Sequence, residues 1–287
     1  MFAFLKGAMR RKKSDPSPTP QAASSLWCGL RDASIDGWFH ERSGELLRGF
    51  VITAEDQVLD VGCGEGVATL FAANQGASVI FTDTEADKVE LVKAKLTNSH
   101  ARQWRGLVSN STPLPLEDGC ASKVICLEVL EHVDDPNQVM AELVRAGKPG
   151  AQYLISVPAA VGEYLQKGIA PDSYFAPPNH VRIFSPEDFS QLVTDAGLVI
   201  EHCQANGFFW VMNMIFYWAS ERAAGRDSQG PVRDHIAQQQ NPLMNDWAGV
   251  WERLLDRPDG LAIKQQLDRL MPKSQVLIAR KPWQDQP

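Results

Sequence analysis

The stretch that decides the fold reads Val58-Leu-Asp-Val-Gly-Cys-Gly-Glu-Gly66, and Val67-Ala-Thr-Leu-Phe-Ala-Ala73 follows it directly. A strand-like run leads straight into three alternating glycines, and the apolar segment after them has a helical composition. Glycine permits a sharp turn and lets a ligand lie against the main chain, while the helix amino terminus offers free N–H groups. This pattern predicts a strand–turn–helix ligand site at the edge of a parallel sheet.

The glycine spacing separates this turn from the dinucleotide fingerprint. Glycines stand at positions 62, 64 and 66, and Val67 occupies the position at which GxGxxG requires another glycine. Asp60, just before the turn, would repel a pyrophosphate and is better suited to a ligand with a positive centre. A nicotinamide-dependent oxidoreductase is therefore a disfavoured alternative.

Outward from the turn, short β-rich runs alternate with longer helical stretches. Helices are predicted after Asp135 and Ser185, each of which precedes a proline and can cap a helix amino terminus. Such alternation is typical of an α/β fold, here a Rossmann-like, doubly wound and mostly parallel seven-stranded sheet with helical cap insertions. The predicted strands are Val58–Val61, Ser78–Thr82, Gly106–Ser109, Lys123–Leu127, Gln152–Val157, Leu198–Cys203 and Gln275–Arg280.

Two insertions interrupt the alternation. Residues 158–184 follow the fifth predicted strand, and the mostly helical residues 207–271 follow the sixth. Ligands bind outside the carboxyl ends of the strands in such sheets, so insertions there can close over a site as a cap. We therefore expect one domain over residues 26–287 with these two cap insertions, preceded by a disordered tail over residues 1–25.

Composition and charge exclude several classes of protein. The chain has 287 residues, of which 44% are hydrophobic and 22% charged, as in an ordinary globular protein, and no apolar run is long enough to span a bilayer. A net charge of −7 argues against a nucleic-acid partner, because that binding relies on lysine and arginine at phosphates. Five scattered cysteines without a CxxC pair are typical of a cytoplasmic protein.

The amino-terminal tail is strongly basic. Residues 1–13 hold five lysines and arginines and no acid, which leaves a net charge of −12 for the rest of the chain. A linker rich in proline and serine follows over residues 14–25. This tail is either solvated and disordered, or a weak peripheral contact with an anionic membrane surface, and both interpretations stay open.

Four ordered motifs resemble those of class I S-adenosylmethionine-dependent methyltransferases, in the small-molecule branch that contains the ubiquinone-pathway O-methyltransferases. With two shorter matches around Pro149 and His180, the resemblance covers about residues 55–205. The resemblance implies that S-adenosyl-L-methionine is the cofactor and that the acceptor is a small molecule, which in one interpretation is apolar or lipid-linked. Oxygen is favoured as the methylated atom. The motifs are Val58–Gly66, Asp83, Ser109–Leu116 and Val124–Val133.

The resemblance also implies roles for single residues. Gly62 and Gly64 would cradle the methionine portion of the cofactor, and Asp83 would hold the ribose hydroxyls. Asn110 stands where the family often has an aspartate facing the adenine amine; it keeps an acceptor oxygen and loses the charge. For Asp83 the alternative is a helix cap. The expected cofactor-binding set is completed by Asp60, Thr84, Ser111 and Leu127, the last with a plain core residue as its alternative.

Two histidines are the candidate catalytic bases. Methyl transfer to a hydroxyl needs a base within hydrogen-bond reach of the proton that leaves. His132 follows the fourth predicted strand, and His180 lies in the first insertion beside two prolines. For His132 a satisfied structural imidazole is the alternative. A non-catalytic protein that binds S-adenosylmethionine is a further class, against which the intact glycine turn argues.

A metal site is a separate hypothesis, and none of the expected site residues is assigned to a metal. Glu128, Glu131 and His132 are spaced i, i+3 and i+4, which on one helical turn would bring two carboxylates and an imidazole together for a divalent ion. Metal-assisted relatives of the ubiquinone-pathway type have this spacing, and many metal-independent relatives have it too. Whether these three residues and His180 bind a metal therefore stays open.

Overall fold

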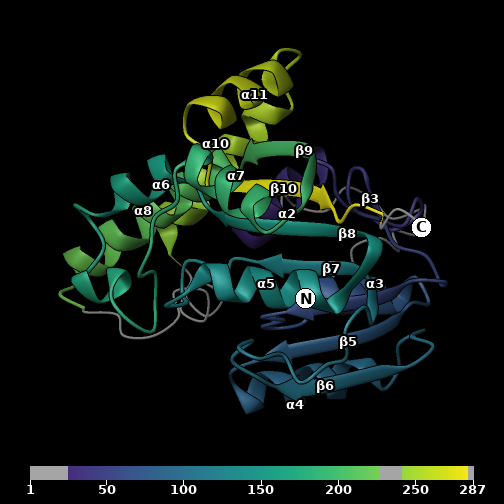
Figure 1. Cartoon of the computed structure of the whole chain (residues 1–287). Helices are drawn as coiled ribbons and strands as arrows, with labels where there is room; N and C mark the ends of the chain where they lie inside the picture. The colour runs from purple at the N-terminus through teal and green to yellow at the C-terminus, as the bar shows by residue number, and fades with distance from the viewer. Residues whose placement is uncertain (1–24, 227–240, 284–287) are drawn as a thin grey trace.

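The structure is a computed structural model that describes residues 25–226 and 241–283. A seven-stranded sheet forms its centre, in the order β6-β5-β4-β7-β8-β10-β9 (Figure 1). All seven predicted strands are present, with shifts of a few residues at their ends. They are β4 (Gln57–Val61), β5 (Ser78–Asp83), β6 (Trp104–Val108), β7 (Ala121–Leu127), β8 (Gly147–Pro158), β9 (Val199–Asn206) and β10 (Ser274–Arg280).

The direction of the strands places the ligand edge. The pairs from β6 to β8 are parallel, whereas β10 runs antiparallel to both β8 and β9. The chain starts at β4, moves outward to β6 and then returns to β7 on the other side of β4. The strand order therefore reverses between β4 and β7, and ligands bind outside the carboxyl ends at such a reversal.

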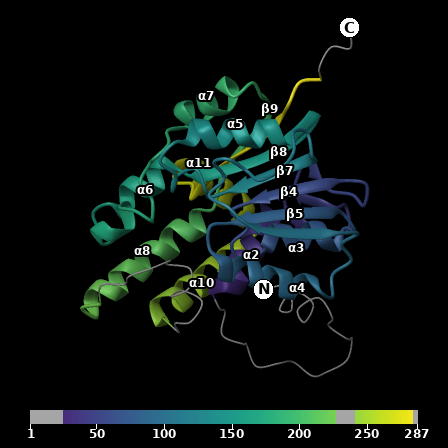
Figure 2. The same ribbon diagram turned by 60° about the horizontal axis from the view of Figure 1, so that its bottom comes forward.

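Helices cover both faces of this sheet (Figure 2). On one face α5 (Pro136–Ala146) and α7 (Pro186–Asp195) pack together, and α3 (Val67–Asn74) and α4 (Ala86–Leu96) pack together on the other. Neighbouring strand residues therefore divide between two cores, as Val58 and Leu59 do. The predicted helix caps are confirmed, because Asp135 accepts hydrogen bonds from two N–H groups of α5 and Ser185 accepts one from α7.

The sequence analysis missed the segment before β4. It forms α2 (Ser25–Ile35) and a small antiparallel sheet of β1 (Trp38–His40), β2 (Glu45–Leu47) and β3 (Phe50–Val51). Leu46, Leu47 and Phe50 are fully buried in the same core as α3. Strands of two or three residues are too short to show a period in the sequence, so only the buried apolar side chains reveal this layer.

Where the structure describes them, the two insertions contribute five further elements. The first holds α6 (Ala160–Gln166) and the 3₁₀ helix η1 (Asp172–Phe175), and the second holds α8 (Phe208–Ala223), α10 (Pro242–Leu255) and α11 (Gly260–Leu270). Figures 1 and 2 show α6 and α8 on the side of the molecule at which the parallel strands end. Their action as a cap stays a prediction.

The tail predicted over residues 1–25 lies outside the described residues up to residue 24, and Ser25 is the first residue of α2. Within the described ranges, no helix combines the length and apolar character that crossing a membrane requires.

Candidate active site

The turn between β4 and α3 has the geometry that its glycines predict. Gly62, Gly64 and Gly66 have φ angles of 71°, 50° and 80°, in the left-handed region that favours glycine. The N–H groups of Gly62 and Cys63 both donate to the carbonyl of Thr82, each at 2.9 Å, so the turn is fixed to the end of β5. Among the described residues no side chain caps α3, which leaves N–H groups at its amino terminus for a ligand.

Asp83 joins this turn to the end of β5. Its carboxylate accepts from the N–H of Gly64 at 2.8 Å and from the N–H of Glu85 at 3.0 Å. The residue at the cap position of α4 is Glu85, so the alternative that Asp83 caps the helix is wrong. A half-buried carboxylate beside the glycine turn still has lone pairs for the two hydroxyls of a ribose.

Asp60 lies beneath the turn. Only 3% of it is exposed, and its carboxylate accepts a hydrogen bond from the hydroxyl of Thr69 on α3. Burial raises the pKa of Asp60 to about 6, against the opposing effect of the Thr69 hydrogen bonds. The structure thus shows that Asp60 connects β4 to α3 through Thr69. Its interaction with the positive centre of the cofactor stays a prediction.

The other expected cofactor residues lie at the ends of neighbouring strands. Thr84 is exposed just after β5, and Leu127 is half-buried at the end of β7, against the core that contains α3. Asn110 is exposed after β6, and its side-chain oxygen accepts from the N–H of Thr112 at 3.2 Å. Ser111 is buried with a φ of 67°. Their roles stay predictions, although all follow strands that end at one edge.

The loop after β7 corrects one expectation. The segment 128–132 is not helical, because Glu128 has a φ of 55° and ends the strand abruptly. Its carboxylate accepts from the hydroxyl of Ser156 at 3.0 Å and faces the ammonium of Lys273 at 3.3 Å. The single helical turn expected for Glu128, Glu131 and His132 is therefore wrong, and Glu128 is held instead by Ser156 on β8 and by Lys273, just before β10.

This loop lies directly against the glycine turn. A β-carbon added at Gly62 would come within 2.3 Å of Cγ2 of Val129, which shows how closely the two segments pack. The side chains that follow Val129 are therefore carried next to the place where the predicted cofactor would lie.

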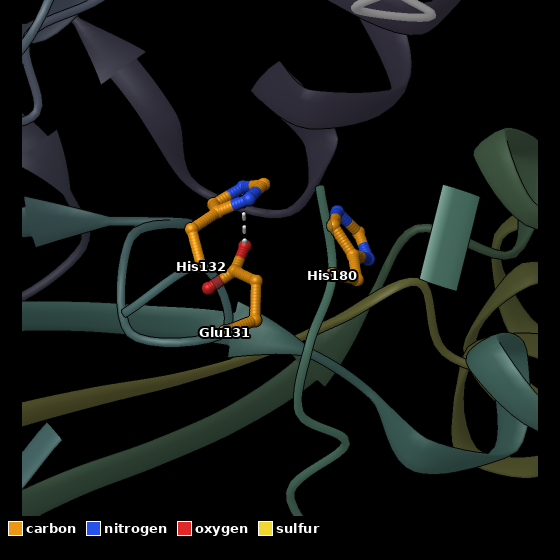
Figure 3. A group of neighbouring side chains, drawn as sticks. All are labelled: Glu131, His132 and His180. Atoms are coloured by element: carbon orange, nitrogen blue, oxygen red, sulfur yellow. Dashed lines mark ion pairs between the residues drawn. The ribbon is translucent and has the colours of Figure 1, made fainter. Parts of the chain in front are cut away.

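The structure brings His132 and His180 together, although they are distant in sequence (Figure 3). Their ring centroids are 5.0 Å apart in an edge-to-face arrangement. Glu131 joins them, and one potential ligand atom from each of the three lies within 4.8 Å of the others. A carboxylate with two imidazoles is a donor set that suits a divalent ion, and metal binding by these residues stays a hypothesis.

Both imidazoles have the same nitrogen occupied. His132 Nδ1 lies 3.2 Å from the carbonyl oxygen of Pro178, and His180 Nδ1 lies 2.7 Å from a carboxylate oxygen of Glu163. Both partners are acceptors, so each neutral ring carries its proton on Nδ1 and keeps a lone pair on Nε2. Burial lowers the pKa of His132, and the neighbouring His180 lowers it further, which favours the basic form at neutral pH.

Glu131 is the least satisfied group of the site. Its side chain is 1% exposed, and neither carboxyl oxygen has a hydrogen-bond partner within the part of the chain that the structure describes. Burial raises its pKa well above the usual range, and the charge of Glu128 adds to this. One of its oxygens faces His132 Nε2 at 3.7 Å, the contact that is dashed in Figure 3.

Sequence reasoning missed three residues around this group. Glu163 on α6 contacts His180, the ring of Tyr174 lies 4.6 Å from that of His180, and Lys273 lies beside Glu128. Burial opposes ionisation of Glu163, but the hydrogen bond with His180 and the charge of Lys273 lower its pKa overall. None of the three stands in a motif, and their positions follow only from the tertiary fold.

The doubly wound sheet with a reversed last strand, the glycine turn and the carboxylate at the end of β5 together define a methyltransferase that uses S-adenosylmethionine. The chain belongs to the family described as "Methyltransferase domain", whose family model matches residues 35–203, more than half of its length. S-adenosyl-L-methionine is therefore its cofactor, and the four motifs identified above carry the fold of this family.

Relatives of known name are similar to part of the chain. A ubiquinone biosynthesis O-methyltransferase from Thiobacillus denitrificans is 29% identical over 160 residues, which cover 52% of this chain and 66% of the relative. One from Klebsiella pneumoniae is 32% identical over 126 residues, covering 42% of this chain and 47% of the relative. The chain thus spans between about half and two thirds of the length of these relatives.

Solved structures share the fold. A SAM-dependent methyltransferase from Methanosarcina mazei superposes with a TM-score of 0.51 at 16% identity, over 81% of this chain and 95% of the other. The YcgJ protein from Bacillus subtilis gives a TM-score of 0.53 at 16% identity, over 86% of this chain and all of the other. At such identity the likeness concerns the fold alone.

Proposed function

We propose that this methyltransferase transfers a methyl group to a hydroxyl oxygen of a small-molecule acceptor. One observation carries the proposal: His132, three residues after the Val129 that packs against Gly62, lies edge-to-face with His180, and each imidazole has its Nδ1 beside an acceptor, which leaves Nε2 to take a proton. Oxygen needs such a base, because a neutral hydroxyl must lose its proton as it attacks. The named activity of the ubiquinone-biosynthesis relatives supports oxygen as the methylated atom.

The chemistry that this arrangement supports is an in-line displacement. The acceptor oxygen forms a bond to the methyl carbon while the bond from that carbon to the sulfonium breaks, and S-adenosylhomocysteine leaves. The proton of the hydroxyl passes to an imidazole Nε2 and then to solvent. Holding the two reactants in line supplies most of the acceleration, and the imidazole supplies the base.

The aromatic helix α8 supports an apolar acceptor. Phe209, Tyr217 and Trp218 are buried on it, and Tyr217 and Trp218 pack in one apolar cluster with Tyr174, the residue that contacts His180. These packed aromatic side chains make the surroundings of Tyr174 and His180 apolar. We therefore include apolar and lipid-linked hydroxyl compounds in the proposed acceptor class.

The test is methyl transfer from S-adenosylmethionine labelled with tritium on the methyl group. Matched acceptors whose nucleophile is a hydroxyl oxygen, an amine nitrogen or an acidic carbon would be offered in parallel. Each set would contain one apolar and one polar compound. We expect label on the hydroxyl compounds alone. Replacing both His132 and His180 by asparagine should lower turnover by about 10²-fold or more, with cofactor affinity within about threefold. Label on amines alone, or undiminished turnover in the double variant, would refute the proposal.

A further inference from the structure

We propose that Glu163 is a positioning residue for the proposed base, holding His180 as the Nδ1–H tautomer with Nε2 directed at the acceptor hydroxyl. This inference rests on the proposed function, and it names His180, rather than His132, as the group that takes the proton. It also gives α6 a part in the chemistry beyond excluding water from the site.

The contact between the two side chains is short and buried. Glu163 Oε2 lies 2.7 Å from His180 Nδ1, and the side chains are 1% and 12% exposed. The other carboxylate oxygen of Glu163 accepts from the amide of Gln166 at 3.2 Å. Both oxygens therefore have a donor, so the carboxylate can turn only by breaking a buried hydrogen bond. A fixed acceptor at Nδ1 determines which nitrogen of the imidazole carries the proton.

The position of Glu163 is set by the helices of the two insertions. Gln166 accepts from the indole N–H of Trp218 on α8 at 3.0 Å, in a fully buried contact. A β-carbon at Gly162 would lie 3.1 Å from the carbonyl of Pro272 and 3.5 Å from Val211, so α6 packs closely against α8 and the segment before β10. These contacts fix α6, and α6 in turn presents the carboxylate to the imidazole.

The two histidines differ in the group that holds Nδ1. His132 faces the carbonyl of Pro178, which is a neutral dipole, whereas His180 faces the carboxylate of Glu163. A carboxylate stabilises the imidazolium that forms when Nε2 takes a proton, and it does so without taking the proton itself. The charge of Glu163 therefore favours proton transfer to His180. The hydroxyl proton moves to Nε2, the methyl carbon leaves sulfur for oxygen, and Glu163 stays ionised throughout.

The first measurement needs no acceptor. Protein labelled with ¹⁵N-histidine and saturated with S-adenosylhomocysteine would be compared between variants at pH 8, with His180→Asn used to assign the signals. We expect the Nδ1–H tautomer for His180 in the wild type, and a shift toward Nε2–H in Glu163→Gln and Glu163→Ala. The control is Glu90→Gln, which removes an exposed helical carboxylate of α4 and should leave the spectrum unchanged.

The second measurement is turnover on a hydroxyl acceptor from the labelling experiment. Glu163→Gln keeps the shape of the side chain, so we expect kcat to fall by about 10²-fold while KM for the cofactor stays within about threefold. An unchanged His180 tautomer in both Glu163 variants, or full kcat in Glu163→Gln, would overturn the inference. If no hydroxyl compound is methylated, the proposed function fails, and the tautomer measurement still decides the role of Glu163. If Glu163→Ala does not fold, Glu163→Gln decides alone.

Discussion

A buried lysine on α11 provides the sharpest test of how the insertions are held to the rest of the fold. The ammonium of Lys264 lies 3.3 Å from Asp32, 2.8 Å from Asp36 and 2.6 Å from Asp268. The Lys264 side chain is 1% exposed, and the three carboxylate side chains are 1%, 13% and 6% exposed. One cation therefore compensates three acids: Asp32 on α2, Asp36 just after α2, and Asp268 on α11.

The same cluster reaches α8. Asp268 accepts from the N–H of Gly207, at the cap position of that helix, at 3.1 Å and from the N–H of Phe208, its first residue, at 2.9 Å. Asp32 accepts from the indole N–H of Trp251 on α10 at 2.8 Å. The cluster thus connects α2 with α8, α10 and α11, and its loss should loosen the packing among these helices.

We predict that Lys264→Met lowers the free energy of unfolding by about 4 kcal/mol at pH 7. Removing one member of a buried ion pair costs about 3–5 kcal/mol, because a charge remains without compensation. For a chain of this size, the melting temperature should fall by about 10 °C.

Urea and thermal unfolding at pH 5.5 and pH 7.5 would measure this penalty. We expect a smaller penalty at pH 5.5, since protonating the stranded carboxylates then costs less. Lys148→Met is the matched control, because it removes an exposed lysine at the start of β8 and should change stability by less than about 0.5 kcal/mol. An equal penalty at both pH values would show that lost packing, and not stranded charge, explains the effect, and would refute the reasoning.

Three further changes test the cofactor side and the cluster. Asp83→Ala should weaken S-adenosylmethionine binding by about 1–3 kcal/mol in isothermal titration, and equal binding would overturn its role at the ribose. Gly62→Ala forces a positive φ and a contact with Val129, so we expect weaker cofactor binding and a lower melting temperature; wild-type values for both would contradict the close packing. Burial raises the pKa of Asp36 to about 7, so its contribution to stability should be complete below about pH 4 and lost as the pH rises through 7. In Asp36→Asn the free energy of unfolding, measured with urea from pH 5 to 8, should not show this loss. A pH dependence parallel to that of the wild type would contradict the prediction.

The sequence was sufficient for the sheet and for the cofactor turn because both are encoded locally. Gly62 and Gly64 are required by positive φ angles that few other residues adopt, and the caps at Asp135 and Ser185 act within one helical turn. A local pattern of this kind survives in the sequence wherever the segment is placed. The short strands β1, β2 and β3 lack it, since their positions depend on burial against a distant core.

The acceptor side is encoded differently, and this explains where the sequence misled. Glu128 stands in the same motif as His132, but its carboxylate is held by Lys273, which is 145 positions away in the sequence. The left-handed φ of Glu128 turns the chain out of β7, so i, i+3 and i+4 no longer describe neighbours on a helix. The group that replaces Glu128 beside Glu131 and His132 is His180, from the first insertion.

Acceptor choice should therefore vary with the insertions more than with the motifs. Two residues on the acceptor side lie outside the motifs shared with the family. They are Glu163, which contacts His180 Nδ1, and Lys273, which holds Glu128. A change in α6 or in the segment before β10 can re-aim the imidazole or release the carboxylate while the glycine turn and Asp83 stay intact. Two chains with the same cofactor motifs can for this reason methylate different compounds, and a comparison of their acceptors should begin at these two positions.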